Sequence, residues 1–549
     1  MPGLPAHPSL EQYKKQAKEF LRAAHARNLD ALDRIRRWHP RFRKANDDAI
    51  AAIVLADAQL VLAHEHGFPS WPKFVAHLQT VNMLRALEDP SGALALNNPA
   101  LSDPASLLLE FASVPRHGWH ASGTLDQANL ILSRYPQVAT ASIYAAAVLG
   151  DASGVKAFLA GNPTLATAPG GPHGWDALTY LCFSRYLRIE KARSDAFVSS
   201  ARALLEAGAS ANARWMETLD EDPPRQIPET AVYGAAGLAQ HAGLTHLLLE
   251  FGADPNDEET PYHVPETRDN TVLQILLDSG RFNEQSLATV LARKADWHDE
   301  HGLALALAHG ANPNYLTNWK VTPFHHAIRR DNSLSAIEKL LDHGADPNIR
   351  NNHDHRNAFQ MAAYQGRGDI LALLESRGFL PHYDQPLEPL VAACARADRT
   401  SADTLLADIP LLLNQLLRIG GTLLARFAGA GNLAGVRLLL HLGIAPDAPW
   451  LEGDPYWELT RNSTALHVAA WRARHDVVRE LIARGASVNA LDARGRTPLQ
   501  LAVRACTDSY WKATRSPDSV AALLAAGAAK QNLNLPTGYD AIDPLLLSS

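Results

Sequence analysis

One short phrase recurs along this chain and limits what the chain can fold into. It reads LLEAGASAN from Leu204, LLEFGADPN from Leu248, LLDHGADPN from Leu340 and LIARGASVN from Leu481. Its glycines and those of looser copies are Gly208, Gly252, Gly310, Gly344, Gly378, Gly443, Gly485 and Gly527, with gaps of 44, 58, 34, 34, 65, 42 and 42 residues. Two gaps match a period of about 33 residues, and the others are that period with insertions or a second unit. The chain is therefore built from repeated units.

A second phrase opens each unit, as in TPFHHAI from Thr322, TALHVAA from Thr464 and TPLQLAV from Thr497. Threonine supplies an N-cap oxygen and proline fits the first helical position, so this phrase predicts the start of a helix. A second helix is predicted through Leu340, and it ends at Gly344 because glycine adopts the left-handed C-cap conformation. Each unit is thus a turn followed by two helices.

Together the two phrases resemble the signature of ankyrin repeats, over roughly residues 140–535. The resemblance implies an all-α fold, an ankyrin-repeat solenoid of about nine or ten helix-turn-helix units, some of them degenerate. It also implies that His325 and His467 are structural and tie neighbouring turns. Several units carry long insertions, which are departures from the family pattern.

The first 80 residues differ from the repeats. Ser9 with Gln12 resembles a capping box that opens a helix, and a second helix is predicted from about residue 47 to 66. The phrase LADAQLVLAHEHGFPSW from Leu55 resembles the helical leader of a group of bacterial ankyrin-repeat proteins, a resemblance that brings no activity with it. Residues 88–104, rich in Pro, Asn and Ser, predict a linker. We expect an N-terminal helical domain at 1–80, a linker with connecting helices at 81–140, the array with insertions at 141–535 and a tail at 536–549.

The composition indicates a compartment for this chain. No apolar run approaches the ~20 residues that cross a bilayer, and the N-terminus does not read as a secretory signal. The three cysteines, Cys182, Cys394 and Cys506, form no CxxC pair, which favours a reducing environment. We expect a cytoplasmic monomer without membrane contact.

No catalytic motif is present in the sequence. Neither the P-loop pattern nor GxSxG occurs, and the histidines of HDH at 353–355 and of the pair His298 and His301 lack an identifiable third ligand. We therefore predict no catalytic residues, no metal ligands and no cofactor.

The insertions at the turn tips are the best candidates for recognition, since motif residues mostly hold a repeat stack together. Aromatic residues dominate interface energetics when they are exposed, but an insertion can instead fold back and bury its aromatic ring on the array. The predicted partner-binding residues are His173, Trp175, Trp215, Tyr315, Trp319, Trp450, Tyr456 and Trp457. We predict a non-enzymatic scaffold that binds a partner protein or peptide in the ankyrin groove.

Two other functions remain open from the sequence. The first is an enzyme or small-ligand protein whose cavity gathers His173, Trp175, Trp215, Trp319, His353, Asp354 and His355. The second is nucleic-acid binding through the basic leader, because residues 1–44 carry a net charge of +7 in a chain of −7. That function needs Arg34, Arg36, Arg37, Arg41, Arg43 and Lys44 on one exposed face. Against it, Ile35, Trp38 and Phe42 have the spacing of a helical core stripe, so nucleic acid is the less favoured partner.

Overall fold

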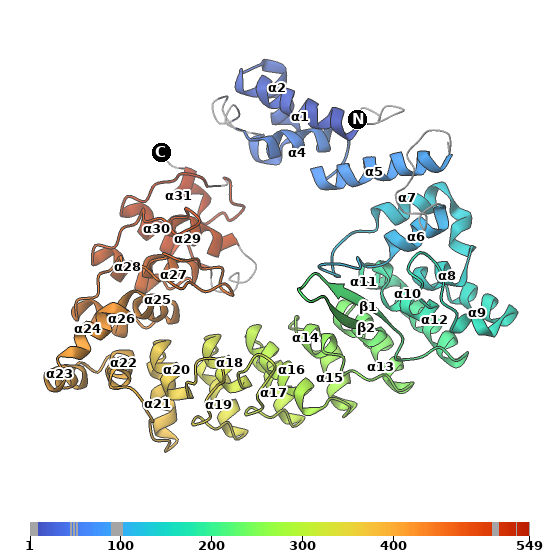
Figure 1. Ribbon diagram of the computed structural model, residues 1–549. Coiled ribbons are helices and arrows are strands. Elements are labelled where there is room, and N and C mark those ends of the chain that lie inside the picture. Colours follow the sequence, from blue (N-terminus) through green and yellow to red (C-terminus); the bar gives the residue numbers. More distant parts are fainter. Residues whose placement is uncertain are drawn as a thin grey trace. The chain divides into compact units, whose positions relative to one another are not determined.

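The structure, a computed structural model, describes residues 9–43, 47, 50, 53–88, 103–507, 515–533 and 535–547. The described chain is mostly helical, with one two-stranded sheet, which confirms the predicted all-α repeat fold (Figure 1). It divides into two compact units, residues 1–286 and 287–549. None of the described helices is both long and apolar enough to cross a membrane.

The N-terminal part of the first unit is helical. Its helices are α1 (Leu10–His25), α2 (Leu29–Trp38), α4 (Leu55–Glu65) and α5 (Trp71–Glu88). The Ser9 hydroxyl accepts from the backbone N–H of Gln12, as the sequence predicts for the start of α1. Within the second predicted helix, Asp47 and Ile50 are helical, Ile53 and Val54 are not, and α4 begins at Leu55, where the Asp57 carboxylate accepts the backbone N–H of Val54 at 2.9 Å and caps the helix. Most of the predicted linker, residues 89–102, lies outside the described part of the chain.

The rest of the first unit holds the opening repeats. Its elements are α6 (Pro104–Ala112), α7 (Asp126–Arg134), α8 (Ile143–Leu149), α9 (Ala152–Gly161), α10 (Ala177–Cys182), α11 (Arg185–Ile189), α12 (Ser194–Glu206), β1 (Arg214–Leu219), β2 (Arg225–Thr230), a π-helical turn η6 (Tyr233–Leu238), α13 (Ala242–Glu250), α14 (Glu259–His263) and α15 (Thr271–Asp278). Helix α16 (Glu284–Asp296) crosses into the second unit.

The second unit continues the array as helix pairs, visible side by side in Figure 1. Its helices are α17 (Glu300–Ala308), α18 (Pro323–Arg329), α19 (Leu334–Asp342), α20 (Ala358–Tyr364), α21 (Gly368–Ser376), α22 (Leu387–Ala395), α23 (Arg399–Asp408), α24 (Leu411–Arg418), α25 (Gly420–Ala430), α26 (Leu433–His441), α27 (Ala465–Trp471), α28 (His475–Ala483), α29 (Pro498–Thr507), α30 (Asp518–Ala525) and α31 (Asp543–Leu547).

The unit that opens at Thr322 shows how the local sequence sets these helices. The Thr322 hydroxyl accepts the backbone N–H of His325, and Gly344 ends the second helix at φ +84°. One ring nitrogen of His325, Nδ1, lies 2.7 Å from the Thr322 hydroxyl. The other, Nε2, donates to the carbonyl of Ile349 at 3.0 Å in the next turn. His467 makes the equivalent contact with the carbonyl of Arg496, so the predicted structural role of both histidines is confirmed.

The insertion after α12 is a β-hairpin, an element that the sequence analysis did not predict. Strands β1 and β2 pair antiparallel, with Trp215 opposite Glu229 and Glu217 opposite Ile227. Since side chains alternate along a strand, these four residues share one face of the hairpin. All four are buried, which places two carboxylates inside the first unit.

Candidate functional site

The structure separates the predicted partner-binding residues into two groups. His173, Trp175 and Trp215 lie in the first unit, whereas Tyr315, Trp319, Trp450, Tyr456 and Trp457 lie in the second. Trp175, Trp215, Trp450 and Trp457 are buried, so for these four rings the insertion folds back on the array instead of exposing the aromatic group. The His173 side chain is only 2% exposed.

The insertion at residues 449–459 covers apolar side chains of the second unit. Trp450, Trp457 and Leu459 form one core cluster with residues of the first helices of three repeats, namely Ala425 of α25, Val468 and Trp471 of α27, and Leu501 and Ala505 of α29. The insertion and these helix residues bury apolar side chains against one another, so the hydrophobic effect holds the insertion in place. The backbone pairing of Trp450 with Ser463 fixes the base of the insertion.

Tyr456 connects this insertion to the C-terminal end of α16. Its hydroxyl donates a hydrogen bond of 2.9 Å to the backbone carbonyl of Asp296, 160 residues earlier in the chain. The guanidinium of Arg330 lies 3.4 Å from the centre of the Tyr456 ring. In the same way, the guanidinium of Arg472 lies 3.8 Å from the centre of the neighbouring Trp457 ring. Two cation–π contacts therefore orient the tip of the insertion.

A buried ion cluster supports that contact. The Asp296 carboxylate accepts hydrogen bonds from His326 Nε2 at 2.8 Å, Arg330 Nε at 2.7 Å and Arg293 Nη1 at 2.6 Å. Burial by itself would raise the pKa of Asp296, but the hydrogen bond from His326 and the charges of the two arginines hold that pKa well below its usual range. Asp296 is thus ionised at neutral pH and fixes the end of α16.

Between α16 and the insertion lies an aromatic cavity of about 290 Å³. Its walls are Trp297, Tyr456, Trp457 and Trp471, with Arg293, Asp296 and Glu458 among them. Trp297 is 38% exposed, so the cavity opens to solvent beside this ring. Aromatic walls with a few polar groups at the rim are typical of a recognition pocket. The sequence predicted Tyr456 and Trp457, but Trp297 and Trp471 were missed because they lie in helix-end and motif positions.

Tyr315 and Trp319 lie on a turn of the same unit. Trp319 is 39% exposed and the neighbouring Leu316 is 42% exposed, whereas Tyr315 is half-buried. The Trp319 ring stacks on His326 at 5.8 Å, and His326 in turn bonds Asp296. This exposed turn is therefore joined to the aromatic cavity through two side chains.

The residues proposed for a small-ligand cavity do not gather within one unit. Trp319, His353, Asp354 and His355 lie in the second unit, apart from the three in the first. His353 and Asp354 line a cavity of about 110 Å³, but its other charged residues are arginines, Arg329, Arg356 and Arg426. Three guanidinium groups disfavour a metal cation there.

In the first unit, by contrast, His173, Trp175 and Trp215 do come together. The His173 and Trp175 ring centres are 4.5 Å apart, and Trp175 stacks on Trp215 at 5.3 Å. Burial lowers the pKa of His173 to about 4, helped by the charge of Arg116. The imidazole is therefore neutral, and neither ring nitrogen has a hydrogen-bond partner among the described residues.

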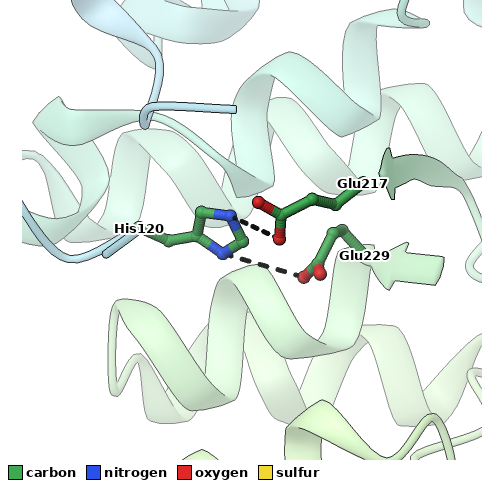
Figure 2. Close-up of side chains that lie close together, drawn as sticks. All are labelled: His120, Glu217 and Glu229. Carbon is green, nitrogen blue, oxygen red and sulfur yellow. Dashed lines mark ion pairs between the residues drawn. The ribbon is translucent and has the colours of Figure 1, made fainter. Parts of the chain in front are cut away.

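The aromatic layer leads to a cluster of three buried ionisable residues, His120, Glu217 and Glu229 (Figure 2). Figure 2 shows the imidazole of His120 with one ring nitrogen toward each glutamate. Nε2 lies 3.3 Å from Glu217 Oε2, and Nδ1 lies 3.8 Å from Glu229 Oε2. The Trp215 ring packs edge-on against His120 at 5.6 Å, which keeps water from this side of the cluster.

Acidic groups gather around these three residues, and each makes ionisation of the others less favourable. Burial, followed by the charges of Glu259, Glu217 and Asp257, raises the pKa of Glu229 to about 9. Burial lowers the pKa of His120, so the imidazole is neutral and supplies no compensating charge. His263 is the nearby cation: although burial opposes it, hydrogen bonds to Glu259 and Glu266 raise its pKa to about 9.

This cluster was not predicted from the sequence. Glu217 lies two residues beyond Trp215, a predicted binding residue, but His120 belongs to the segment between α6 and α7, and Glu229 lies 12 residues beyond Glu217. The available signal was the alternation of side chains along the segments RWMETL and RQIPET. It places Trp215 and Glu217 on one face of the first strand, and Ile227 and Glu229 on one face of the second. The histidines of HDH at 353–355 and the pair His298 and His301 do not belong to a group of three or more close metal-ligand side chains among the described residues.

Some arginines of the basic leader are paired with acidic residues, so fewer of them are available to phosphate groups than the net charge suggests. Arg34 forms a two-pronged ion pair with Glu65, at 2.7 and 2.8 Å, and Arg36 pairs with Asp33 and Asp47. Ile35 and Phe42 are buried and Trp38 packs against the same core, as the core-stripe interpretation predicts. Lys44 lies outside the described residues. Neutralised arginines weaken the nucleic-acid hypothesis.

Known proteins resemble parts of this chain. A family model described as ankyrin repeats in many copies matches residues 307–362 and 451–502, the second range including Tyr456 and Trp457. An ankyrin repeat protein of fowlpox virus (strain NVSL) is 28% identical over 176 residues. That match covers 28% of this chain and 49% of the viral protein, so it spans about half of the relative's length.

Two solved structures are similar in sequence and cover less than half of the chain. The ankyrin repeat domain of human ASB11 is 24% identical and covers 44% of this chain and 98% of its own, with a TM-score of 0.20. The ankyrin repeat domain of Bcl-3 is 21% identical and covers 43% of this chain and 97% of its own, with a TM-score of 0.18.

Proposed function

The chain is an ankyrin-repeat protein, and from that premise we propose that it is a non-enzymatic scaffold that binds a partner protein or peptide. Ankyrin arrays generally bind partners on extended surfaces, and the stack forms without a ligand. The proposed binding site is the groove of the second unit, around the aromatic cavity formed by Trp297, Tyr456, Trp457 and Trp471.

The observation that carries this proposal is the cavity itself. Its walls come from the end of α16 and from an insertion 160 residues later, and Tyr456 fixes the two relative to each other through its hydrogen bond to Asp296. A preformed aromatic pocket lowers the entropic cost of binding, because its rings are already ordered. Such pockets take the anchor side chain of an interface.

The chemistry of the walls suggests what the anchor is. A volume of about 290 Å³ accommodates one large side chain, and four aromatic rings favour an apolar or aromatic group. The exposed Leu316 and Trp319 then offer apolar contact for neighbouring residues of the partner. A short apolar segment of a partner fits this surface better than a small polar ligand does.

Location and oligomeric state are part of the proposal. All three cysteines are free and buried, which suits a chain that works in a reducing compartment such as the cytoplasm. We propose that the chain acts there as a monomer, with one partner site per chain.

The test is affinity capture with tagged full-length protein from nuclease-treated lysate of the source organism. A double variant, Trp297→Ala with Trp319→Ala, removes the two exposed rings at the cavity and its turn. Trp119→Ala is the matched control, because Trp119 is 74% exposed and belongs to the first unit. Supporting results are a protein retained by the wild type and the control but lost from the double variant, and a Kd about 30-fold weaker for that variant. Equal retention by all three would reject the site.

A further inference from the structure

The buried cluster of His120, Glu217 and Glu229 has no use in partner binding through the second unit. We propose that these three residues bind one divalent transition-metal ion of the zinc class. Each contributes one ligand atom, and the three atoms lie within 4.8 Å of one another. The proposal does not depend on the scaffold function.

The ligands converge from three separate elements. His120 lies on the turn between α6 and α7, Glu217 on β1 and Glu229 on β2. The register of the hairpin sets Glu217 and Glu229 on the same face, two residues out of register with each other. A strand pair holds such side chains more firmly than a loop does, so the two carboxylates are preorganised.

Hydrogen bonding leaves ligand atoms unused at the centre of the cluster. Among the described residues, Nε2 of His120 and Oε2 of Glu229 are buried without a hydrogen-bond partner. The His120 residue is 6% exposed and Glu229 is 1% exposed, so water does not reach them from bulk solvent. Buried polar atoms are almost always paired in folded proteins, so two unpaired atoms in one buried cluster point to a bound group such as an ion.

The composition of the site suits a cation. Among the described residues, the ion pairs of the Glu217 and Glu229 carboxyl groups are with two histidines, His117 and His120. Two carboxyl groups buried side by side are costly unless a cation neutralises them. A divalent ion between the two carboxylates removes that cost and also satisfies the unused nitrogen.

The ligand types select the zinc class. An imidazole nitrogen with two carboxylate oxygens suits Zn²⁺ and neighbouring transition ions, whereas Mg²⁺ and Ca²⁺ prefer oxygen alone. Zinc bonds of about 2.1 Å require tetrahedral ligand atoms to lie about 3.4 Å apart. The Nε2 to Oε2 distance for Glu217, 3.3 Å, already matches this spacing, whereas Glu229 Oε2 lies 3.8 Å from the other ring nitrogen, Nδ1, so the Glu229 side chain has to turn toward Nε2 when the ion binds.

Tyr233 orients the imidazole for this role. Its hydroxyl lies 3.2 Å from Nδ1 of His120, so a proton on Nδ1 donates to Tyr233 and the lone pair of Nε2 is left for the metal. Metal-binding histidines almost always use the second ring nitrogen in this way. Tyr233 is therefore a positioning residue of the site.

A bound ion would link the turn at His120 to the hairpin, so binding should raise the thermal stability of the protein. Chelator-treated full-length protein is titrated with Zn²⁺ by calorimetry, with Mg²⁺ and Ca²⁺ as separate arms, and its Tm is measured with and without one equivalent. We expect one Zn²⁺ per chain, a rise in Tm, and no response to Mg²⁺ or Ca²⁺. Cobalt substitution should give visible d–d absorption bands from the same site.

Variants separate the site from general metal binding. Glu229→Gln keeps the shape of the side chain but cannot become a carboxylate when a cation binds, so the apo protein should be at least as stable as the wild type while the Zn²⁺ response is lost. Tyr233→Phe should weaken the metal affinity 10- to 100-fold. The control is His382→Ala, whose side chain is 66% exposed in the second unit, and it should bind Zn²⁺ as the wild type does. Circular dichroism checks that each variant is folded.

Two results would overturn the proposal. One is a wild-type protein that holds no stoichiometric Zn²⁺ after dialysis and shows no cobalt bands. The other is a Glu217→Gln, Glu229→Gln double variant that is folded and retains one equivalent with unchanged affinity, which would place the ion elsewhere.

Discussion

Arg472 donates a hydrogen bond of 2.6 Å from Nη2 to the carboxylate of Asp331, although 141 residues separate them in the chain. The same carboxylate accepts from Arg474 at 2.8 Å and from Arg367 at 2.9 Å. Residues of three repeats therefore meet on one side chain that is 14% exposed. In most solenoids a repeat contacts only its neighbours, and this contact adds a longer-range tie.

Asp331→Asn should lower the free energy of unfolding of the second unit by about 3–5 kcal/mol, since it removes the carboxylate that pairs with the buried side chains of Arg367 and Arg472. Asparagine is the right replacement because Asp331 has φ +58°, a conformation that asparagine tolerates. Urea unfolding measures the change. Asp342→Asn, which removes an exposed pair with Arg377, should cost less than about 1 kcal/mol. Equal effects of the two substitutions would contradict the role of Asp331.

Trp457→Ala should lower the free energy of unfolding by about 3–5 kcal/mol, because Trp457 is 6% exposed and packs within the core under the insertion. Loss of the ring should also free the insertion, so limited proteolysis should cut near residues 449–463 in the variant and not in the wild type. Trp319→Ala removes a ring that is 39% exposed, and it should change stability by less than about 1 kcal/mol. A stable, protease-resistant Trp457→Ala protein would show that the insertion is held by other contacts.

Stability should fall in mild acid through two histidines. Burial lowers the pKa of His325 and of His173 to about 4, from 6.5. Between pH 6.5 and 4 the unfolded chain binds more protons than the folded one, so the free energy of unfolding rises with pH. The stability contributed by the neutral rings is present above about pH 6.5 and is lost as pH falls toward 4, by on the order of 3 kcal/mol for each histidine.

Urea unfolding at pH 7.5, 6.5, 5.5 and 4.5 follows this loss. The His173→Phe variant keeps an aromatic ring next to Trp175 but does not titrate, so its stability should fall less steeply over the same range. If the wild type and His173→Phe lose stability in parallel, His173 does not contribute to the acid response.

Gly344→Ala should lower the free energy of unfolding by about 1–2 kcal/mol. A Cβ at this position meets nothing within 4 Å, so the cost comes from the backbone alone, which has φ +84°. Gly161→Ala is a matched control, because it also meets open space but has no positive φ, and there alanine should be neutral or stabilising. Thermal melts of the two variants measure the difference, and a neutral Gly344→Ala would show that the C-cap tolerates a side chain.

The repeats could be predicted from the sequence because their signals are local. The contact between Thr322 and His325 spans three residues, and the turn at Gly344 depends on one residue type. The interruption of the predicted second helix at Ile53 and Val54 is also set locally, by the capping bond from Val54 to Asp57, which helical periodicity does not contain.

The candidate sites depend on contacts that no local pattern records. Tyr456 was singled out as an aromatic residue in an insertion, but its partner Asp296 lies 160 residues away. His120 is separated from its neighbour Tyr233 by 113 residues, and the strands that carry the two glutamates are only six residues long. Three-dimensional convergence decides both sites, and a single sequence gives no measure of it.

The hydrogen bond from Tyr456 to Asp296 also has a mechanical meaning. A linear stack pulled at its ends can peel away one repeat at a time, each step releasing a short length of chain. Here the hydrogen bond joins the last residue of α16 to a residue of the insertion 160 positions later in the chain. Under tension, the repeats between Asp296 and Tyr456 should stay folded until this contact breaks. They should then extend together in one large step.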